Sequence, residues 1–328
     1  EIRIGDWSSD VCSSDLNFKR KIIGYVSDHF GDAYTVDETD CVKNNDTTYH
    51  GISLREKDSN IAPIIYLDEL YQIYSNGESI QQIAESVIDH FRIYVNVPDL
   101  NLDEIDNYEA VKKRLGVKLL NRSLNSSYIE KKVYVEYMDL IIVFFLEYED
   151  MSIGKGIIGV TPDMLSMWDI DTETLLRDAT ENMNKNYPVE FTSLVDLLIR
   201  EYKYRFEDEN NIQREDIKDI VEQLTSLSTY DRQLYVLTNE SHNLGASTIL
   251  YPDTLSKVGS ALNTDFYLIP SSIHEIIIIP DNGNVNEEVM NKMIRTVNSE
   301  HLSPEEVLSD HLYRYHRVNR VLEPVHSM

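Results

Sequence analysis

The longest uninterrupted apolar run in the chain, Leu140–Leu146, limits what the protein can fold into. It is seven residues long and lies between Asp139 and Glu147, whereas a helix that crosses a bilayer needs about 20 such residues. A short apolar run between acidic residues is typical of a strand that is buried on both faces. The sequence therefore predicts a protein built around a buried sheet, without a membrane-spanning segment.

Length and element order predict the fold class. The 328 residues suffice for one large domain or two medium ones, and the 42% hydrophobic and 27% charged contents are those of a folded protein. Predicted helices and strands follow one another in mixed order, which favours an α+β fold with mixed or antiparallel sheets and helices packed on them. We expect two subdomains, at residues 17–130 and 131–328, with a soft boundary in the acidic stretch 205–216.

The first sixteen residues do not read as natural protein. The segment Asp6–Leu16, DWSSDVCSSDL, matches the translation of a common short-read sequencing adapter. We therefore predict that residues 1–16 are an artefactual tail and that the natural N-terminus is truncated, since no Met precedes Asn17. Without this tail the chain keeps a single cysteine, Cys41, so neither an intrachain disulfide nor a cysteine zinc site is expected.

The charge excludes two classes of partner. The chain has 57 acidic and 30 basic residues, a net charge of −27, and it keeps −24 when residues 1–16 are left out. Such a surface repels phosphate backbones and anionic lipids, so we expect neither nucleic-acid nor membrane binding. A DNA-mimic inhibitor is one alternative that the acidity permits, provided that the carboxylates follow one elongated face.

Several elements can be predicted from local patterns. The clearest is a helix over Glu78–Val95, whose apolar residues recur with a period of 3.6. Asn44-Asn45-Asp46 predicts the turn of a hairpin formed by Ala33–Lys43 and Thr47–Arg55. Further helices are expected at Ile105–Leu115, Glu190–Tyr204, residues 217–224 and after the capping box Ser303-Pro304-Glu305-Glu306, and further strands at Ser247–Leu250 and Ile273–Ile279.

Polar side chains precede the last of these strands. Ser271, Ser272, His274 and Glu275 follow Pro270 and lead into Ile276–Ile279. Three kinds of side chain that exchange protons thus enter one apolar strand, where they could line the rim of a pocket. The alternative is that His274 holds a loop through hydrogen bonds.

Other chemistry is weakly represented. The sequence has no phosphate-binding loop, no paired zinc-ligand histidines on a helix and no nucleophile elbow, and Cys41 reads as a small half-buried residue. His301, His311 and His316, with Asp310 and Glu305, are a weak candidate metal cluster. We therefore assign no catalytic residue, metal or cofactor. The 21 tyrosines are typical either of core edges or of protein-binding surfaces.

Several motifs resemble one family. The segments are Asn60-Ile61-Ala62-Pro63, Val160-Thr161-Pro162-Asp163, Leu250-Tyr251-Pro252 and Pro270-Ser271-Ser272-Ile273-His274-Glu275. From Asn17 to its end the chain resembles an uncharacterised family of gut Clostridia, domain of unknown function 5688. The resemblance implies a cytoplasmic bacterial protein and no settled activity, and Tyr251, Ser271, Ser272, His274 and Glu275 match its motifs.

Three hypotheses about function follow. The leading one is a module that binds a protein or peptide without catalysis, because catalytic motifs are missing and tyrosines are many. The second is an enzyme with a pocket around Ser271, Ser272, His274 and Glu275. The third is the DNA-mimic inhibitor.

Overall fold

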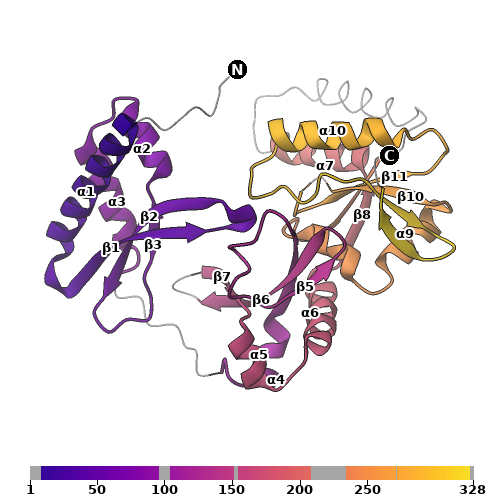
Figure 1. Ribbon diagram of the computed structural model, residues 1–328, viewed down its shortest axis with the longest axis horizontal. Coiled ribbons are helices and arrows are strands. Elements are labelled where there is room, and N and C mark those ends of the chain that lie inside the picture. The colour runs from indigo at the N-terminus through magenta and orange to yellow at the C-terminus, as the bar shows by residue number, and fades with distance from the viewer. Residues whose placement is uncertain (1–8, 96–103, 151–153, 208–233, 271, 326–328) are drawn as a thin grey trace. The chain divides into compact units, whose positions relative to one another are not determined.

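The computed structural model describes residues 9–95, 104–150, 154–207, 234–270 and 272–325 (Figure 1). The described residues form two compact units. Unit 1 draws on Glu1–Lys43, Thr47–Glu104 and Glu149–Gly156, and unit 2 on Asn44–Asp46, Ile105–Tyr148 and Ile157–Met328. Compactness does not test independent folding, so the predicted subdomains 17–130 and 131–328 stay a prediction. The predicted boundary 205–216 and the predicted helix 217–224 lie largely or wholly outside the described residues.

Unit 1 combines a three-stranded antiparallel sheet with helices. Its strands are β1 (Tyr34–Val42), β2 (Thr48–Glu56) and β3 (Ile64–Tyr66), in the order β1-β2-β3. Its helices are α1 (Ser9–Phe30), α2 (Asp68–Ser75) and α3 (Ile80–Arg92). The predicted hairpin is confirmed, and its turn places Asn45 and Asp46 at φ 58° and 49°, a conformation that Asn and Asp tolerate.

The core of unit 1 lies between these helices and β2. The apolar stripe of α3 is buried as its period predicts, and it meets Ile52 and Leu54 of β2. Phe18, Ile22 and Val26, spaced one turn apart on α1, complete the core. One face of the sheet is thus covered by helices (Figure 1).

Unit 2 contains two sheets. In the four-stranded antiparallel sheet, β6 (Leu140–Asp150) lies between β4 (Leu115–Asn121) and β5 (Tyr134–Tyr137) and also pairs with β7 (Gly154–Gly159). Every residue of Leu140–Leu146 is buried, which confirms the predicted strand. The six-stranded sheet has the order β13-β12-β10-β11-β9-β8, with the bounds Val189–Ser193 (β8), Tyr235–Asn239 (β9), Phe266–Ile269 (β10), Ile276–Pro280 (β11), Tyr313–His316 (β12) and Val321–Pro324 (β13).

Helices cover the sheets of unit 2. They are α4 (Tyr108–Val111), α5 (Pro162–Trp168), α6 (Thr172–Asn186), α7 (Leu194–Glu207), α9 (Thr254–Leu262) and α10 (Glu287–Glu300). Phe266 and Leu268 of β10 enter the large core of this unit, whereas Tyr267 and Ile269 face the other way and pack with Ile294 of α10. The alternation buries both faces of β10, and Figure 1 shows α10 along one side of this sheet. The predicted α+β class is confirmed.

Some predicted elements are wrong. Glu190–Ser193 belongs to β8, and α7 begins only at Leu194, because the apolar residues there pair with β9. Ser247–Leu250 lies in a 3-10 helix, Gly245–Leu250, in which Ser247 and Thr248 donate hydrogen bonds to backbone carbonyls three residues back. Ser303–Glu306 forms a turn instead of starting a helix, and Ile105–Leu115 contains only the short α4 and a 3-10 turn before β4.

Gly51 allows β3 to approach β2 closely. A Cβ atom at this position would lie 2.7 Å from the carbonyl oxygen of Ile65 and 2.9 Å from Cγ2 of Ile64. The nearer neighbour is backbone, so the strands would have to separate. We expect Gly51→Ala to lower the free energy of unfolding by about 1–3 kcal/mol, the usual cost of overpacking.

Gly24 in α1 provides the matched control, since nothing lies within 4 Å of a Cβ atom there. Gly24→Ala should raise the free energy of unfolding by about 0.5–1 kcal/mol, because alanine is the better helix former. Urea unfolding followed by circular dichroism measures both variants. Equal stability of the two would contradict the close packing of β3 on β2.

Candidate functional site

The predicted pocket residues lie in a loop of unit 2. Ser271 is outside the described residues, and the loop from Ser272 to Glu275 connects β10 to β11. The buried Ser272 hydroxyl accepts the His274 backbone N–H at 3.0 Å, and the Ser272 N–H donates to the Glu275 carbonyl. A side chain that hydrogen-bonds the backbone of its own loop offers these backbone groups an alternative to pairing in a sheet. The expectation of a strand from Ile273 is therefore wrong, and β11 begins at Ile276.

His274 is engaged on both sides of its ring. Its Nδ1 accepts the backbone N–H of Leu244 at 3.2 Å, which requires the Nε2–H tautomer, and Nε2 lies 3.7 Å from Oε1 of Glu306. The Thr238 hydroxyl donates to the His274 carbonyl oxygen. The ring and backbone of His274 thus hold adjoining loops together, and neither nitrogen contacts a nucleophilic side chain of the described residues.

The same loop depends on Gly245. A Cβ atom at Gly245 would overlap with the Thr238 hydroxyl and the His274 carbonyl oxygen. Two further backbone bonds fix the loop, from Ala246 N–H to the Ile273 carbonyl and from Ile273 N–H to the Glu306 carbonyl. The segment is therefore closely packed and holds the neighbouring loops together. Its assignment as a binding site stays a prediction.

Tyr251, the fifth predicted residue, lies in the core. It is buried, and burial raises the pKa of its phenol. Its hydroxyl lies near the side chains of Ser247 and Asn239 but does not reach hydrogen-bond geometry with either. It packs in the same apolar cluster as Ile249 and Val258. The structure thus brings Ser272, His274 and Glu275 together in one loop and places Tyr251 in the core.

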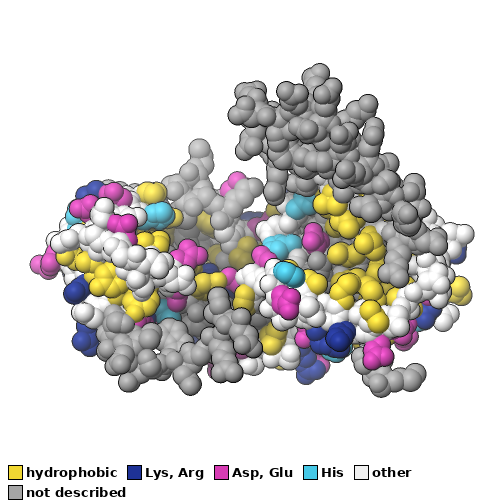
Figure 2. Space-filling model, turned by 90° about the horizontal axis from the view of Figure 1, so that it is seen from above, with side chains coloured by type: hydrophobic (Ala, Val, Ile, Leu, Met, Phe, Trp, Pro, Cys, Tyr) yellow, Lys and Arg dark blue, Asp and Glu magenta, His cyan; other side chains and the backbone are white. Residues whose placement is uncertain are grey.

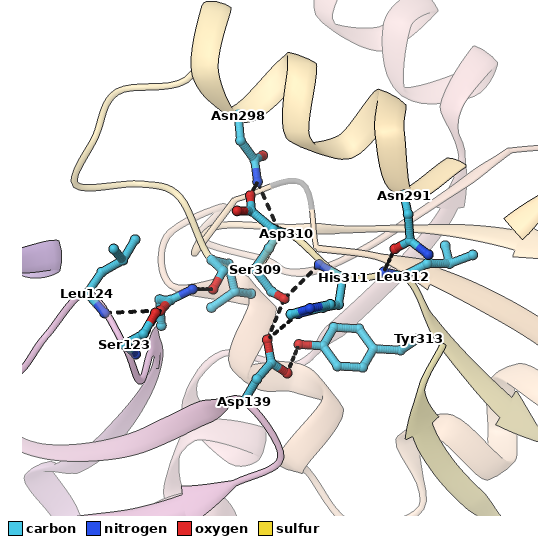
Figure 3. A network of polar contacts seen from close by, with 12 residues as sticks. Ser123, Leu124, Asp139, Asn291, Asn298, Ser309, Asp310, His311, Leu312 and Tyr313 are labelled. Atoms are coloured by element: carbon cyan, nitrogen blue, oxygen red, sulfur yellow. Dashed lines mark hydrogen bonds and ion pairs between the residues drawn. The ribbon is translucent and has the colours of Figure 1, made fainter. Parts of the chain in front are cut away.

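A polar network that the sequence did not indicate surrounds Asp139 (Figure 3). Asp139 lies in the turn between β5 and β6, and Ser309 and His311 precede β12. Oδ2 of Asp139 accepts the Ser309 hydroxyl at 2.6 Å and His311 Nδ1 at 3.1 Å, and Oδ1 accepts the Tyr313 hydroxyl at 2.6 Å. The carboxylate therefore joins the two sheets of unit 2.

Neighbouring amides extend the network. Asn298 of α10 donates to the Ser309 carbonyl and to the Asp310 carboxylate, and Asn291 accepts the backbone N–H of Leu312 (Figure 3). These bonds hold the segment that carries Ser309 and His311 against α10. The network contains a serine, a histidine and an aspartate, but the serine and the histidine both contact the carboxylate, so they do not form a nucleophile–base pair.

Hydrogen bonds set the charge of Asp139. Burial opposes its ionisation, yet the donors Ser309, Tyr313 and His311 outweigh burial and lower the pKa of this carboxyl. Burial and the adjacent carboxylate raise the pKa of Tyr313. Near neutral pH the Asp139 carboxylate is therefore charged, and the Ser309 and Tyr313 hydroxyls that donate to it are neutral.

The predicted histidine cluster does not assemble. His311 faces Asp139, His316 lies between Asp265 and Glu323, and His301 lies near Glu300. Among the described residues, no group of three or more His, Cys, Asp or Glu side chains could hold a metal ion. No helix within the described ranges is both long and apolar enough to cross a membrane.

A groove of about 390 Å³ lies in unit 1, and none of the five predicted pocket residues lines it. Its walls come from β2, β3, α2 and α3, and its lining is mostly apolar and aromatic. The lining residues are Tyr49, Ile64, Ile65, Tyr66, Asp68, Glu69, Leu70, Ile73, Ser86, Val87 and His90. Its volume lies within the range of about 300–1,000 Å³ that is usual for ligand sites.

The groove is built by two aromatic rings and the ends of the helices. Tyr49 and Tyr66 pack with ring centroids 5.2 Å apart, and Lys43 Nζ lies 5.2 Å from the Tyr66 centroid. Ile73 of α2 remains 47% exposed at the groove. An apolar groove with tyrosines and an exposed isoleucine is equipped to bury the side chains of a partner. The high number of tyrosines was a signal in the sequence, but it did not show which of them meet.

Two buried tyrosines provide a matched test of the Asp139 network. Tyr313→Phe removes a hydrogen bond to a carboxylate and should cost about 1.5–3 kcal/mol of unfolding free energy. Tyr251→Phe removes a hydroxyl that does not reach hydrogen-bond geometry with the nearby Ser247 and Asn239 side chains, and it should change the free energy of unfolding by less than about 0.5 kcal/mol. Urea unfolding at neutral pH compares them, and equal costs would contradict the network.

Acid should weaken unit 2 through Asp139. Its pKa is lower in the folded than in the unfolded chain, where it is about 3.9, so its contribution is complete above that value and is lost as the pH falls through the folded pKa. We expect Asp139→Asn to be less stable near neutral pH and to lose less stability than the unsubstituted chain below about pH 4.

The fluorescence of Trp168 can follow this loss. Trp168 is buried in unit 2 and donates a hydrogen bond to the Ile105 carbonyl. The other tryptophan, Trp7, can be replaced by phenylalanine in both chains. Parallel pH profiles of the two chains would contradict the assignment to Asp139.

Comparisons with known proteins identify one family. The model of a family of unknown function, DUF5688, matches residues 16–317. Searches of curated proteins and of solved structures find no match to the chain. Because the match extends over most of the chain and agrees with the motifs noted in the sequence, the chain belongs to the family of unknown function DUF5688.

Proposed function

We propose that this protein binds a segment of another protein in the groove of unit 1 and that it does so without catalysis. The observation that carries the proposal is the groove itself, with Tyr49, Tyr66 and the exposed Ile73 around a volume of about 390 Å³. Tyrosine and exposed aliphatic side chains in a concave site are the usual means of holding a peptide. The proposal includes a protein partner and a cytoplasmic location.

The enzyme hypothesis has less support. Its key residue, His274, accepts a backbone N–H at Nδ1, and Ser272 caps its own loop, so both are engaged in holding the chain. Catalysis by a serine and a histidine needs a hydrogen bond between them that leaves the serine free to attack.

The DNA-mimic hypothesis also has less support. A mimic of a phosphate backbone needs carboxylates in one continuous strip. On the face that Figure 2 displays, acidic side chains are scattered among hydrophobic and basic ones. The acidity therefore does not favour this function over peptide binding.

Selection of peptides from a random display library tests the proposal. The full chain is immobilised, and the enriched peptides are synthesised and their affinities measured by calorimetry. Ile73→Asp places a charge in the groove and should weaken binding at least tenfold, since a buried apolar contact is replaced by an unpaired carboxylate.

Val289→Asp is the matched control. Val289 on α10 is 59% exposed and belongs to unit 2, so its substitution alters exposed apolar surface outside the groove. It should leave the affinities unchanged. If no peptide is enriched, or if all peptides bind the Ile73 variant as well as the unsubstituted chain, the proposed function is wrong.

A further inference from the structure

The outer strand of the sheet in unit 1 offers an unpaired edge. β3 lies at one end of the order β1-β2-β3, and no described strand pairs with its far side. The edge is short, because β3 comprises only Ile64–Tyr66. An exposed edge of this kind is a template for one more strand.

The register decides which groups face outward. Leu67 donates its N–H to the His50 carbonyl, and Leu54 donates to the Pro63 carbonyl. Hydrogen-bonded pairs alternate in an antiparallel ladder, so Ile65, opposite Ile52, also faces β2. The N–H and C=O groups of Ile64 and Tyr66 therefore point away from β2, and no described residue accepts a hydrogen bond from either of these two N–H groups.

The groove follows this edge. Ile65 packs against the core under the helices, whereas the Tyr66 ring lies on Tyr49 and the Ile64 side chain lies near Gly51. All three residues of β3 line the groove, although their side chains alternate between the two faces of the sheet. The groove therefore follows the edge of the strand, where the outward backbone groups are.

The charges around the groove are mainly acidic. Asp68 and Glu69 line it, and the adjoining hollow of about 480 Å³, which shares Ser86 and His90 with the groove, carries Glu85 and Asp89. Arg92 pairs with Asp89 at 2.6 Å, and the Asp68 carboxylate accepts the His50 backbone N–H. Glu69 and Glu85 keep exposed carboxylates that a cationic side chain can approach.

We propose that an extended segment of a partner protein joins the sheet as a strand beside β3, with apolar side chains in the groove and a Lys or Arg next to Glu69 and Glu85. The inference rests on the proposed function, whose binding site it specifies. Main-chain hydrogen bonds to Ile64 and Tyr66 supply affinity, and alternate side chains supply selectivity, as in other strand additions. A second copy of this chain fits less well, because the residues around its own β3, from Asn60 to Leu70, include no Lys or Arg that could approach Glu69 and Glu85.

N-methylation of a selected peptide tests the strand directly. Each backbone N–H of the peptide is methylated in turn, and affinity for the full chain is measured by calorimetry. Strand addition predicts that methylation weakens binding at least tenfold at every second position and much less at the positions between, since only alternate N–H groups face β3. A peptide that binds as a helix would lose affinity at consecutive interior positions, and that result would overturn the inference.

Charge reversal tests the cationic residue. Glu69→Lys should weaken binding of a Lys- or Arg-containing peptide several-fold, and a peptide with Glu at that position should regain it. Glu288→Lys, at an exposed site on α10, is the control and should have no effect.

The outcomes separate the two proposals. If Ile73→Asp weakens the binding of the peptides but N-methylation does not weaken it at alternate positions, strand addition is wrong and binding in the groove is still supported. Failure to select any peptide that depends on Ile73 removes both. Concentration-dependent dimers, detected by light scattering and abolished by Ile73→Asp, would assign the edge to a second copy and overturn the inference.

Discussion

The pairing of β3 with β2 is the interaction on which the candidate binding site depends. Gly51 lets the Ile65 carbonyl come close enough to complete this pairing, and the alternation that follows turns the polar groups of Ile64 and Tyr66 outward. The same pairing fixes Ile65 over the core of Phe18 and Phe91 and so places α2 and α3 beside the strand. A groove, an unpaired edge and an acidic rim are thus consequences of one short strand.

Unit 2 is organised around a half-buried anion instead of a groove. Asp139 collects three donors from the segment before and within β12, which makes one carboxylate the link between two sheets. His274 serves a comparable purpose for the loops around Gly245. Hydrogen-bonded polar networks specify one arrangement of their surroundings, and both clusters fit that description better than they fit catalysis.

Local signals in the sequence were sufficient for much of the fold. The stripe of α3 and the turn at Asn44–Asp46 could be predicted because each depends on neighbours within a few residues. β8 could not, since its partner β9 is far along the chain and the helix α7 follows β8 without a break. The Asp139 network was missed for the same reason, as 170 residues separate Asp139 from Ser309. The groove depends on which tyrosines meet, and spacing does not reveal that.

Hydrogen exchange of individual amides, measured by NMR on the full chain with and without a selected peptide, tests the central claim most directly. Strand addition predicts that the amides of Ile64 and Tyr66 gain at least tenfold protection on binding, because they acquire partners. The amide of Ile65, already directed at β2, should change much less. Protection confined to α2 and α3, or equal changes at all three residues of β3, would contradict the account.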